Sequence, residues 1–578
     1  MFRKTQKETQ MDLFYSPSNL LGRRASTKFY DPKAWQNIFY KEVTSRIDES
    51  LFSVLFDSAN GAPNASVCRL VAMMLLKEGY GCSDEQLFEK CEFDLLARKA
   101  LGLDGFEEDI PCAATYYNFR AALLDYQEKE GVDLLQKCFE QVTGSQVKAY
   151  GVSGKSVRMD SKLIGSNIAL YSRYVLVHKT MCKYLKNTDL QRFDEDRRSR
   201  MEGYLSEDAA KTVYRSTPEL MKTKLQVLGE DVYAMLQFAP ELPLLKRVFD
   251  EQFFVENGVV IVRPKKEIPA DSLQNPNDPD ATYRNKNEKP VQGYTTNITE
   301  TCGEKGKPSL ITGVHVETAT FADCNFLQDD IAQSERVTGD KVEKCHADGA
   351  YQSPDNREFA KSHFLEEGEN VEDMDAGHKV MELMTGKMQG GSRFDLYLEG
   401  EELTVIDKQT CETHKAVKSK AENYKGTIPM KRWRIPWQPN KGRPWRYFTE
   451  KDIKASELRR QIESLSAEDQ RMRNNIEAAM FQYSFHTRNN KTRYRGLAKH
   501  RMHAYARSMW MNFRRLAIFH SLSENHLFCA FCGLIWTFLT HPNLLFKKLS
   551  LKITSHHRSA MRFVFEGYYK QTLLNATF

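Results

Sequence analysis

Hydrophobic residues recur at helical spacing from Pro32 to about residue 150. The clearest run is Val67, Leu70, Val71, Met74 and Leu75. This spacing predicts helices with one buried face. Ser83, followed by Gln86 three residues later, is typical of a helix capping box. Short helices separated by glycine turns are compatible with an all-α DNA-binding domain of the helix-turn-helix kind, and also with a plain bundle or a dimerisation domain. We expect a flexible polar tail over residues 1–30.

The pattern changes near Gly151, where strands begin to alternate with helices. Residues 156–162 alternate apolar and polar side chains, which predicts a half-buried strand with Asp160 on its polar side. Further strands are expected over 294–298, 310–316 and 341–347, and helices over 168–185 and 326–334. This order predicts an α/β fold with a mixed sheet, in which Asp160 and Asp348 lie at strand ends. We assign residues 151–378 to the first part of this core, with a helical and loop insertion over about 190–285.

The segment 379–450 is predicted to be a β-rich insertion. Its residues 394–406 indicate a hairpin that turns around Glu399 to Glu402. A long helix is expected to begin near Thr449 and to reach Glu477. The core would then finish with C-terminal helices over 451–520, and residues 521–578 are a tail of unknown role.

Positive charge is concentrated in two stretches, although the net charge of the 578 residues is only +6. Residues 431–446 carry six Lys or Arg and no acid. Residues 471–515 carry eleven Lys or Arg, and Glu477 is the one acid among them. Local basic fields of this kind suit a phosphate backbone. A solvated helix face is an equally good interpretation of a charge run taken alone.

Cysteine usage and hydropathy indicate a cytoplasmic protein. The twelve cysteines have no repeated spacing, which argues for reduced thiols. The most apolar stretch, Leu527 to Leu539, is 13 residues long, whereas a membrane helix needs about 20. The polar start of the chain shows no secretory signal. We therefore expect a cytoplasmic location and no membrane partner.

Three acidic residues have settings that favour catalysis. Asp160 and Asp348 each follow a strand-like run, and Glu477 lies on a predicted helix, four residues after Arg473. Carboxylates from two strands and a helix can hold two divalent metals, which can cut and rejoin DNA. The chain has 77 Asp and Glu, so the local contexts carry this argument rather than the residue type. Arg473 could orient Glu477, grip a phosphate, or form an ordinary ion pair.

The chain resembles DDE-class transposases of bacterial insertion sequences, which have an RNase H-like catalytic core. The likeness runs from about residue 31 to 520 and is carried by three blocks. These are 75–87 with 101–103 and Pro111; 278–283, 293–294, 313–323 and 347–351; and Arg473-x-x-x-Glu477 with 494–497 and 510–516. In the family signature around the last acid, Tyr-x2-Arg-x3-Glu-x6-Lys, Gln470 and Ser484 stand at the Tyr and Lys positions.

The resemblance implies that Asp160, Asp348 and Glu477 are the catalytic carboxylates and hold two Mg²⁺ ions, with Mn²⁺ as a possible substitute. It implies DNA as the partner, both the ends of the element and the target, and a homodimer in the DNA complex. The residues expected to contact DNA are Arg473, Arg488, Lys491, Arg493, Arg495, Trp433, Trp437 and Trp445. The tryptophans could stack on flipped bases, or could instead anchor the core of a small β-module.

Two other functions remain open at this stage. The departures at Gln470 and Ser484 favour an inactive transposase relic that binds DNA as a repressor. A metal-dependent nuclease without strand transfer would use the same carboxylates. A purely structural helical protein would leave the settings of the three acids unexplained.

Overall fold

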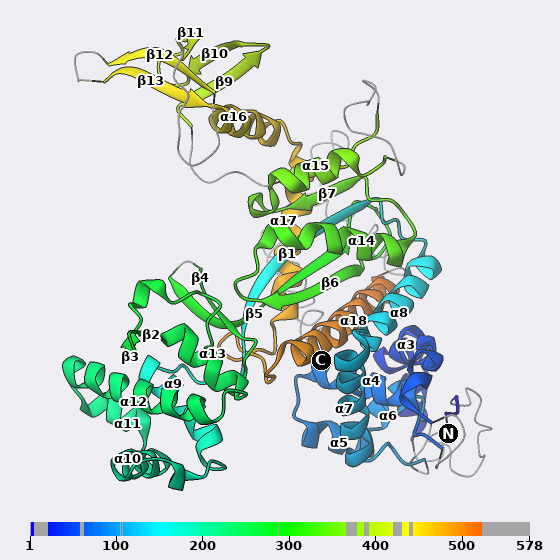
Figure 1. Cartoon of the computed structure of the whole chain (residues 1–578). Coiled ribbons are helices and arrows are strands. Elements are labelled where there is room, and N and C mark those ends of the chain that lie inside the picture. Colours follow the sequence, from blue (N-terminus) through cyan, green and yellow to red (C-terminus); the bar gives the residue numbers. More distant parts are fainter. Residues whose placement is uncertain are drawn as a thin grey trace, which may run out of the picture. The chain divides into compact units, whose positions relative to one another are not determined.

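The computed structural model shows a mixed α/β protein (Figure 1). It describes residues 2–4, 21–57, 63–103, 106, 108–286, 288–365, 378–385, 392–419, 431–438 and 443–522. Residues 1–517 form one compact unit and residues 518–578 a second. Within the described ranges, no helix is long and apolar enough to cross a membrane. The predictions for Leu527 to Leu539 fall outside the described residues.

The first part of the compact unit is helical. Its helices are α2 (Arg23–Phe29), α3 (Trp35–Glu42), α4 (Val67–Tyr80), α5 (Asp84–Phe93), α6 (Leu95–Ala100), α7 (Ala113–Glu130) and α8 (Leu134–Tyr150). The predicted capping box at Ser83 is confirmed at the start of α5. The expectation of a loose tail is wrong for Arg23–Phe29, because α2 buries Phe29.

A six-stranded mixed sheet follows. Its strands are β1 (Ser156–Gly165), β4 (Thr282–Lys286), β5 (Lys289–Thr301), β6 (Ile311–Thr318), β7 (Lys344–Ala347) and β8 (Glu382–Thr385). The order is β4-β5-β1-β7-β8, and β6 also pairs with β5. β5 is antiparallel to β1 and β6, whereas β7 is parallel to β1 and β8. All four strands predicted for the core are present, with shifted ends.

Three short helices accompany the later strands. They are α14 (Leu327–Thr338), the turn η6 (Gly349–Tyr351) and α15 (Pro354–Ser362). α14 packs on β6 and β5. Val157 and Met159 of β1 face this side of the sheet, where they join Leu327 and Ile331 in one apolar cluster.

A helical insertion between β1 and β4 has its own apolar core. It contains α9 (Arg173–Leu185), α10 (Glu195–Ser206), α11 (Ala209–Arg215), α12 (Pro218–Phe238), α13 (Pro243–Gln252), β2 (Phe253–Glu256) and β3 (Val259–Val262). Asp231 lies fully buried in this core and is ion-paired with Arg197 and Arg200. A buried carboxylate is tolerated when it is paired and hydrogen-bonded, as here.

The segment after β8 forms a five-stranded antiparallel sheet. Its strands are β9 (Phe394–Glu399), β10 (Glu402–Asp407), β11 (Thr413–Lys418), β12 (Arg432–Gln438) and β13 (Arg443–Thr449), in the order β13-β12-β11-β10-β9. The predicted hairpin is confirmed, because Glu399 pairs with Glu402 across a turn at Gly400. One face of this sheet packs on α16 (Glu450–Glu463).

The single long helix predicted from Thr449 is wrong. Two helices are present, α16 and then α17 (Ala467–Tyr483), which carries Glu477. α16 ends at Ser464, and the Ser466 side chain accepts a hydrogen bond from the Asp469 N–H to begin α17. A serine in this position favours a new helix start over continuation. The last helix among the described residues is α18 (Leu497–Leu522).

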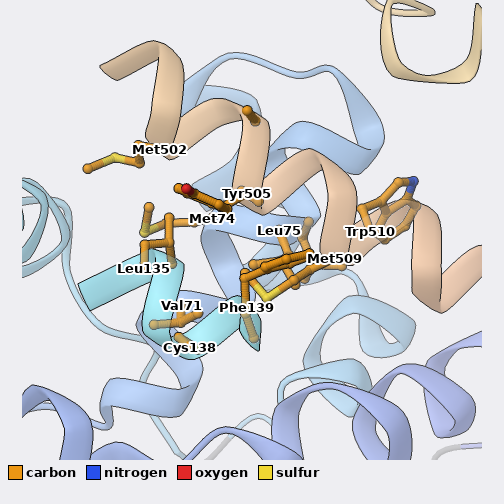
Figure 2. Close-up of a cluster of buried hydrophobic side chains, with 14 of the residues drawn as sticks. Val71, Met74, Leu75, Leu135, Cys138, Phe139, Met502, Tyr505, Met509 and Trp510 are labelled. Atoms are coloured by element: carbon orange, nitrogen blue, oxygen red, sulfur yellow. The ribbon is translucent and has the colours of Figure 1, made fainter. Parts of the chain in front are cut away.

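The helices that precede the sheet share a core with α18 rather than forming a core of their own. Figure 2 shows Val71, Met74 and Leu75 of α4, Leu135, Cys138 and Phe139 of α8, and Met502, Tyr505, Met509 and Trp510 of α18. The same cluster includes Ile298 and Val314 of the mixed sheet and Ile476 of α17. A contiguous cluster marks one folding unit, so the N-terminal helices are structurally joined to the sheet.

Candidate functional site

Asp160 lies on β1, and Asp348 directly follows β7, the adjacent parallel strand. The register of β1 and β7 pairs Ser156 with Lys344 and ends at Arg158 with His346. Asp160 and Asp348 each lie two residues beyond this last pair, at the same end of the two strands. The charge of Asp348 acts on Asp160, so the two carboxylates influence each other.

The surroundings of this pair are electrostatically unfavourable for two anions. Burial, together with the nearby charges of Asp348 and Asp323, raises the pKa of Asp160 to about 6. The hydrogen bond from the Ser161 N–H and the charge of Lys286 act in the opposite direction. Asp348 is more exposed, and its carboxylate accepts a hydrogen bond from the Gly349 N–H at 2.5 Å. Two close carboxylates of this kind favour a bound cation.

Helix α17 lies across the face of β1 that carries Asp160. Arg158 donates to the Met472 carbonyl at 3.4 Å, and Lys162 donates to the Met480 carbonyl at 3.4 Å. Side chains two apart on a strand share a face, so Asp160 lies between these two contacts. It therefore faces the stretch of α17 between Met472 and Met480, which contains Glu477.

Arg473 contacts Asp348 rather than Glu477. Its Nη1 lies 3.6 Å from Asp348 Oδ1. This ion pair links α17 to the turn after β7 and places a cation beside the carboxylate pair. Glu477 itself is exposed. Among the residues that the structure describes, no three His, Cys, Asp or Glu side chains are grouped closely enough to hold a metal ion, so Glu477 stands apart from the pair.

A buried polar network supports the turn that carries Asp348. Asn297 of β5 donates to Asp330 of α14 at 2.5 Å and accepts a hydrogen bond from the Tyr351 hydroxyl. His315 Nδ1 lies 3.1 Å from the other carboxylate oxygen of Asp330. Burial lowers the pKa of His315, but the charge and hydrogen bond of Asp330 outweigh burial, so the pKa is raised overall. Sequence reasoning missed these residues, because only the register of β5 and β6 brings them together.

The C-terminal end of α4 is held by residues that follow Glu477. The carboxylate of Glu78 accepts a hydrogen bond from the Tyr494 hydroxyl and lies 2.6 Å from Nδ1 of His503. Arg507 donates to the Glu78 carbonyl at 2.7 Å and to the Gln482 carbonyl, at the end of α17, at 2.5 Å. We call Glu78, Tyr494, His503 and Arg507 the clasp. It connects α4 and α18 with the end of the helix that carries Glu477.

Burial and charge oppose each other at the clasp. Burial alone raises the pKa of Glu78, but the charge of His503 and the hydrogen bonds from His503 and Tyr494 outweigh it and lower that pKa to about 2. The guanidinium of Arg507 is buried, which lowers its pKa to about 10. Each charged group has hydrogen-bond partners, as buried charges require.

Several basic residues predicted to contact DNA make contacts within the protein. Arg493 donates to the carbonyls of Gly81 and Cys82, Arg495 donates to Asn167, and Lys491 donates to Ile168. These bonds favour a structural role for Lys491, Arg493 and Arg495. Arg488 is exposed, so its side chain is accessible to a DNA phosphate.

The three tryptophans of the β-rich segment have different surroundings. Trp433 is 2% exposed, and its indole N–H donates to the Glu401 carbonyl at 3.1 Å. Trp437 packs edge-on against Phe394 beside the same core. These contacts favour the core-anchoring interpretation for both. Trp445 is 39% exposed and is the one that presents its ring to solvent.

Comparison with known proteins bears on the helical segment. Residues 28–122 match the family model of a transposase domain, DUF772. The match runs from the end of α2 into the first half of α7 and includes Glu78 of the clasp. No curated protein and no solved structure matches the chain. Residues 28–122 are thus similar to a transposase domain, and Glu78 within this segment is joined through the clasp to the end of the helix with Glu477.

Proposed function

We propose that this protein is a DNA transposase of the DDE class with an RNase H-like core. The observation that supports the proposal most is that Asp160 on β1 and Asp348, directly after β7, lie at the same end of two adjacent parallel strands, where β1 packs against the helix that bears Glu477. The transposase domain at residues 28–122 supports it. The six-stranded mixed sheet, in which β1, β4 and β6 pair antiparallel with β5 while β7 and β8 continue parallel to β1, suits the RNase H-like part of the proposal.

The donor set suits divalent cations. Asp160 and Asp348 offer only oxygen ligands, which Mg²⁺ prefers and Mn²⁺ accepts. The raised pKa of Asp160 reflects burial first and then the negative charges of Asp348 and Asp323, and a cation bound beside the carboxylate would offset both. Asp160 and Asp348 would hold the metal, and Glu477 would complete the set from α17. Bound there, two such ions would supply Lewis acidity to a water or 3′-hydroxyl nucleophile and to the leaving oxygen.

The protein's own residues would position the DNA. Arg473 is paired with Asp348 and could exchange this partner for a phosphate at the element end, because guanidinium groups bind phosphate through two parallel hydrogen bonds. The exposed Arg488 would add charge nearby. The product of this chemistry would be strand transfer into target DNA, with a homodimer holding two ends.

The altered signature position at Ser484 is compatible with activity. Its hydroxyl accepts a hydrogen bond from Lys162 at 2.7 Å. A lysine ammonium from β1 therefore lies at the place on α17 where the family signature has its own lysine. This contact weighs against the inactive relic, which that departure otherwise favours.

An excision assay in cells tests the proposal. The DNA that flanks the gene would surround a marker, and the protein would be supplied in trans. We expect marker loss with the unaltered chain and none with Asp160→Asn, Asp348→Asn or Glu477→Gln. Asp355→Asn, an exposed acid seven residues after Asp348, is the matched control and should excise normally.

The outcomes separate the alternatives. Excision by Asp348→Asn would refute the catalytic assignment. Binding to the flanking DNA without excision by any form would favour the relic. Cleavage without joined junctions would favour a nuclease.

A further inference from the structure

The five-stranded sheet has an outer face that α16 does not cover. Trp433 and Ile435 of β12 and Phe448 of β13 lie in the core on α16. Alternate residues of a strand point to opposite faces, so Arg434 points away from that core. Its cross-strand neighbours are Val417 and Tyr447.

Arginine and aromatic side chains alternate on this outer face. The Arg434 guanidinium lies 4.3 Å from the ring centroid of Trp445, and that of Arg432 lies 4.9 Å from the ring centroid of Tyr447. Tyr447 is directly opposite Arg434 in the register. We call Arg432, Tyr447, Arg434 and Trp445 the outer ladder.

The ladder is accessible and positively charged. Trp445 is 39% exposed, Tyr447 41% and the adjacent Val417 60%. The sequence from 431 to 446 contains no acid. Glu401, in the turn before β10, and Glu402, at the start of β10, are paired with Lys418 and Lys415 of β11. Within the part of the chain described, Arg434 Nε has no hydrogen-bond partner.

We propose that the outer ladder binds unpaired nucleotides of single-stranded DNA. Exposed aromatic rings stack on bases of any sequence, and arginines beside them hold the phosphates and add cation–π contacts. An acidic protein segment would use the arginines and leave the rings without a role. This inference deepens the proposed function, because cleavage at an element end exposes unpaired bases. It keeps the stacking role expected for Trp445, adds Tyr447, and withdraws that role from Trp433 and Trp437.

Fluorescence anisotropy with a labelled oligothymidylate of about 12 nucleotides, a length in the range of such sites, tests this with the full chain. We expect Trp445→Ala and Arg434→Gln each to weaken binding about tenfold, and Trp445→Phe to restore most of it. Tyr214→Ala is the matched control, since Tyr214 is a 90% exposed aromatic on α11. Far-ultraviolet circular dichroism establishes that each variant is folded.

A second probe separates stacking from charge. An abasic deoxyribose-phosphate strand of equal length lacks bases, so Trp445→Ala should bind it as the unaltered chain does, while Arg434→Gln should bind it less well. Equal affinity of Trp445→Ala and the unaltered chain for oligothymidylate would overturn the proposal. Equally strong competition by polyglutamate would also overturn it, in favour of an acidic protein partner.

The inference can fail independently of the proposed function. Asp160→Asn should bind oligothymidylate normally, because Asp160 lies on a different sheet. Normal ladder binding without excision would leave this inference standing and remove the transposase proposal. If Trp445→Ala leaves both excision and oligothymidylate binding unchanged, this inference is refuted and the transposase proposal stands.

Discussion

Replacing Glu78 by glutamine should weaken the protein in a way that depends on pH. The substitution keeps the size and polarity of the side chain but removes the charge that faces His503 at 2.6 Å. Tyr494 can still donate to the amide oxygen. The change therefore isolates the electrostatic part of the clasp, and Glu85→Gln, an exposed acid on α5, is the matched control.

The size of the effect follows from the pKa. The pKa of Glu78 is lowered from an ordinary 4.5 to about 2 in the folded protein, and such a shift corresponds to about 3 kcal/mol of folding stability at neutral pH. Because the folded pKa is the lower one, the stabilisation is complete above pH 4.5 and is lost as the pH falls toward 2. At pH 3.5 about 1 kcal/mol of it should already be gone.

Urea denaturation followed by tryptophan fluorescence measures this, because Trp510 lies in the core that the clasp closes. At pH 7 we expect Glu78→Gln to lower the free energy of unfolding by about 3 kcal/mol and Glu85→Gln to leave it nearly unchanged. The difference between Glu78→Gln and the unaltered protein should shrink between pH 5 and pH 3.5. A constant difference across that range would refute the electrostatic reasoning and leave packing as the cause.

Three further substitutions test packing and the buried network by thermal denaturation. Gly79→Ala should destabilise by about 1–3 kcal/mol, because the new Cβ would overlap the Trp510 ring; a higher melting temperature would show that helix propensity outweighs this clash. Trp433→Ala should lower the free energy of unfolding by about 3–5 kcal/mol. A nearly unchanged free energy of unfolding would contradict the place of Trp433 in the core. Tyr351→Phe should lower the free energy of unfolding by about 1–3 kcal/mol, because it leaves an Asn297 oxygen without its donor, and it should also reduce excision. Unchanged stability together with unchanged excision would contradict the role of this network in supporting Asp348.

Local features of the fold could be predicted from the sequence. The strand that carries Asp160, the capping box at Ser83 and the hairpin at Gly400 each depend on a few adjacent residues, and each is present. The proximity of Asp160 and Asp348 could also be expected, since two strands of one sheet place their ends together. The break between α16 and α17 was predictable in principle from Ser466, a good N-cap residue.

Features that depend on distant contacts could not be predicted. The basic residues after Glu477 looked unopposed along the chain, but Arg501 is paired with Glu317 and Arg515 with Glu300, both on strands of the mixed sheet. Arg493 satisfies carbonyls of the α4 end. A charge run gives no sign of partners hundreds of residues away, so it overstates the charge available to DNA.

The shared core has a consequence for synthesis. The apolar faces of α4 and α8 are covered by Met502, Met509 and Trp510 of α18, and about 430 residues separate the end of α4 from Trp510. At about 5–20 residues per second, translation leaves these faces uncovered for about 20–90 s. For most of its transit along the message, the ribosome therefore carries these helices without α18, which completes their core. The core that these helices share with α18 is complete only when nearly all of the polypeptide has been made. Because their apolar faces are exposed until then, newly synthesised chains are a target for chaperones.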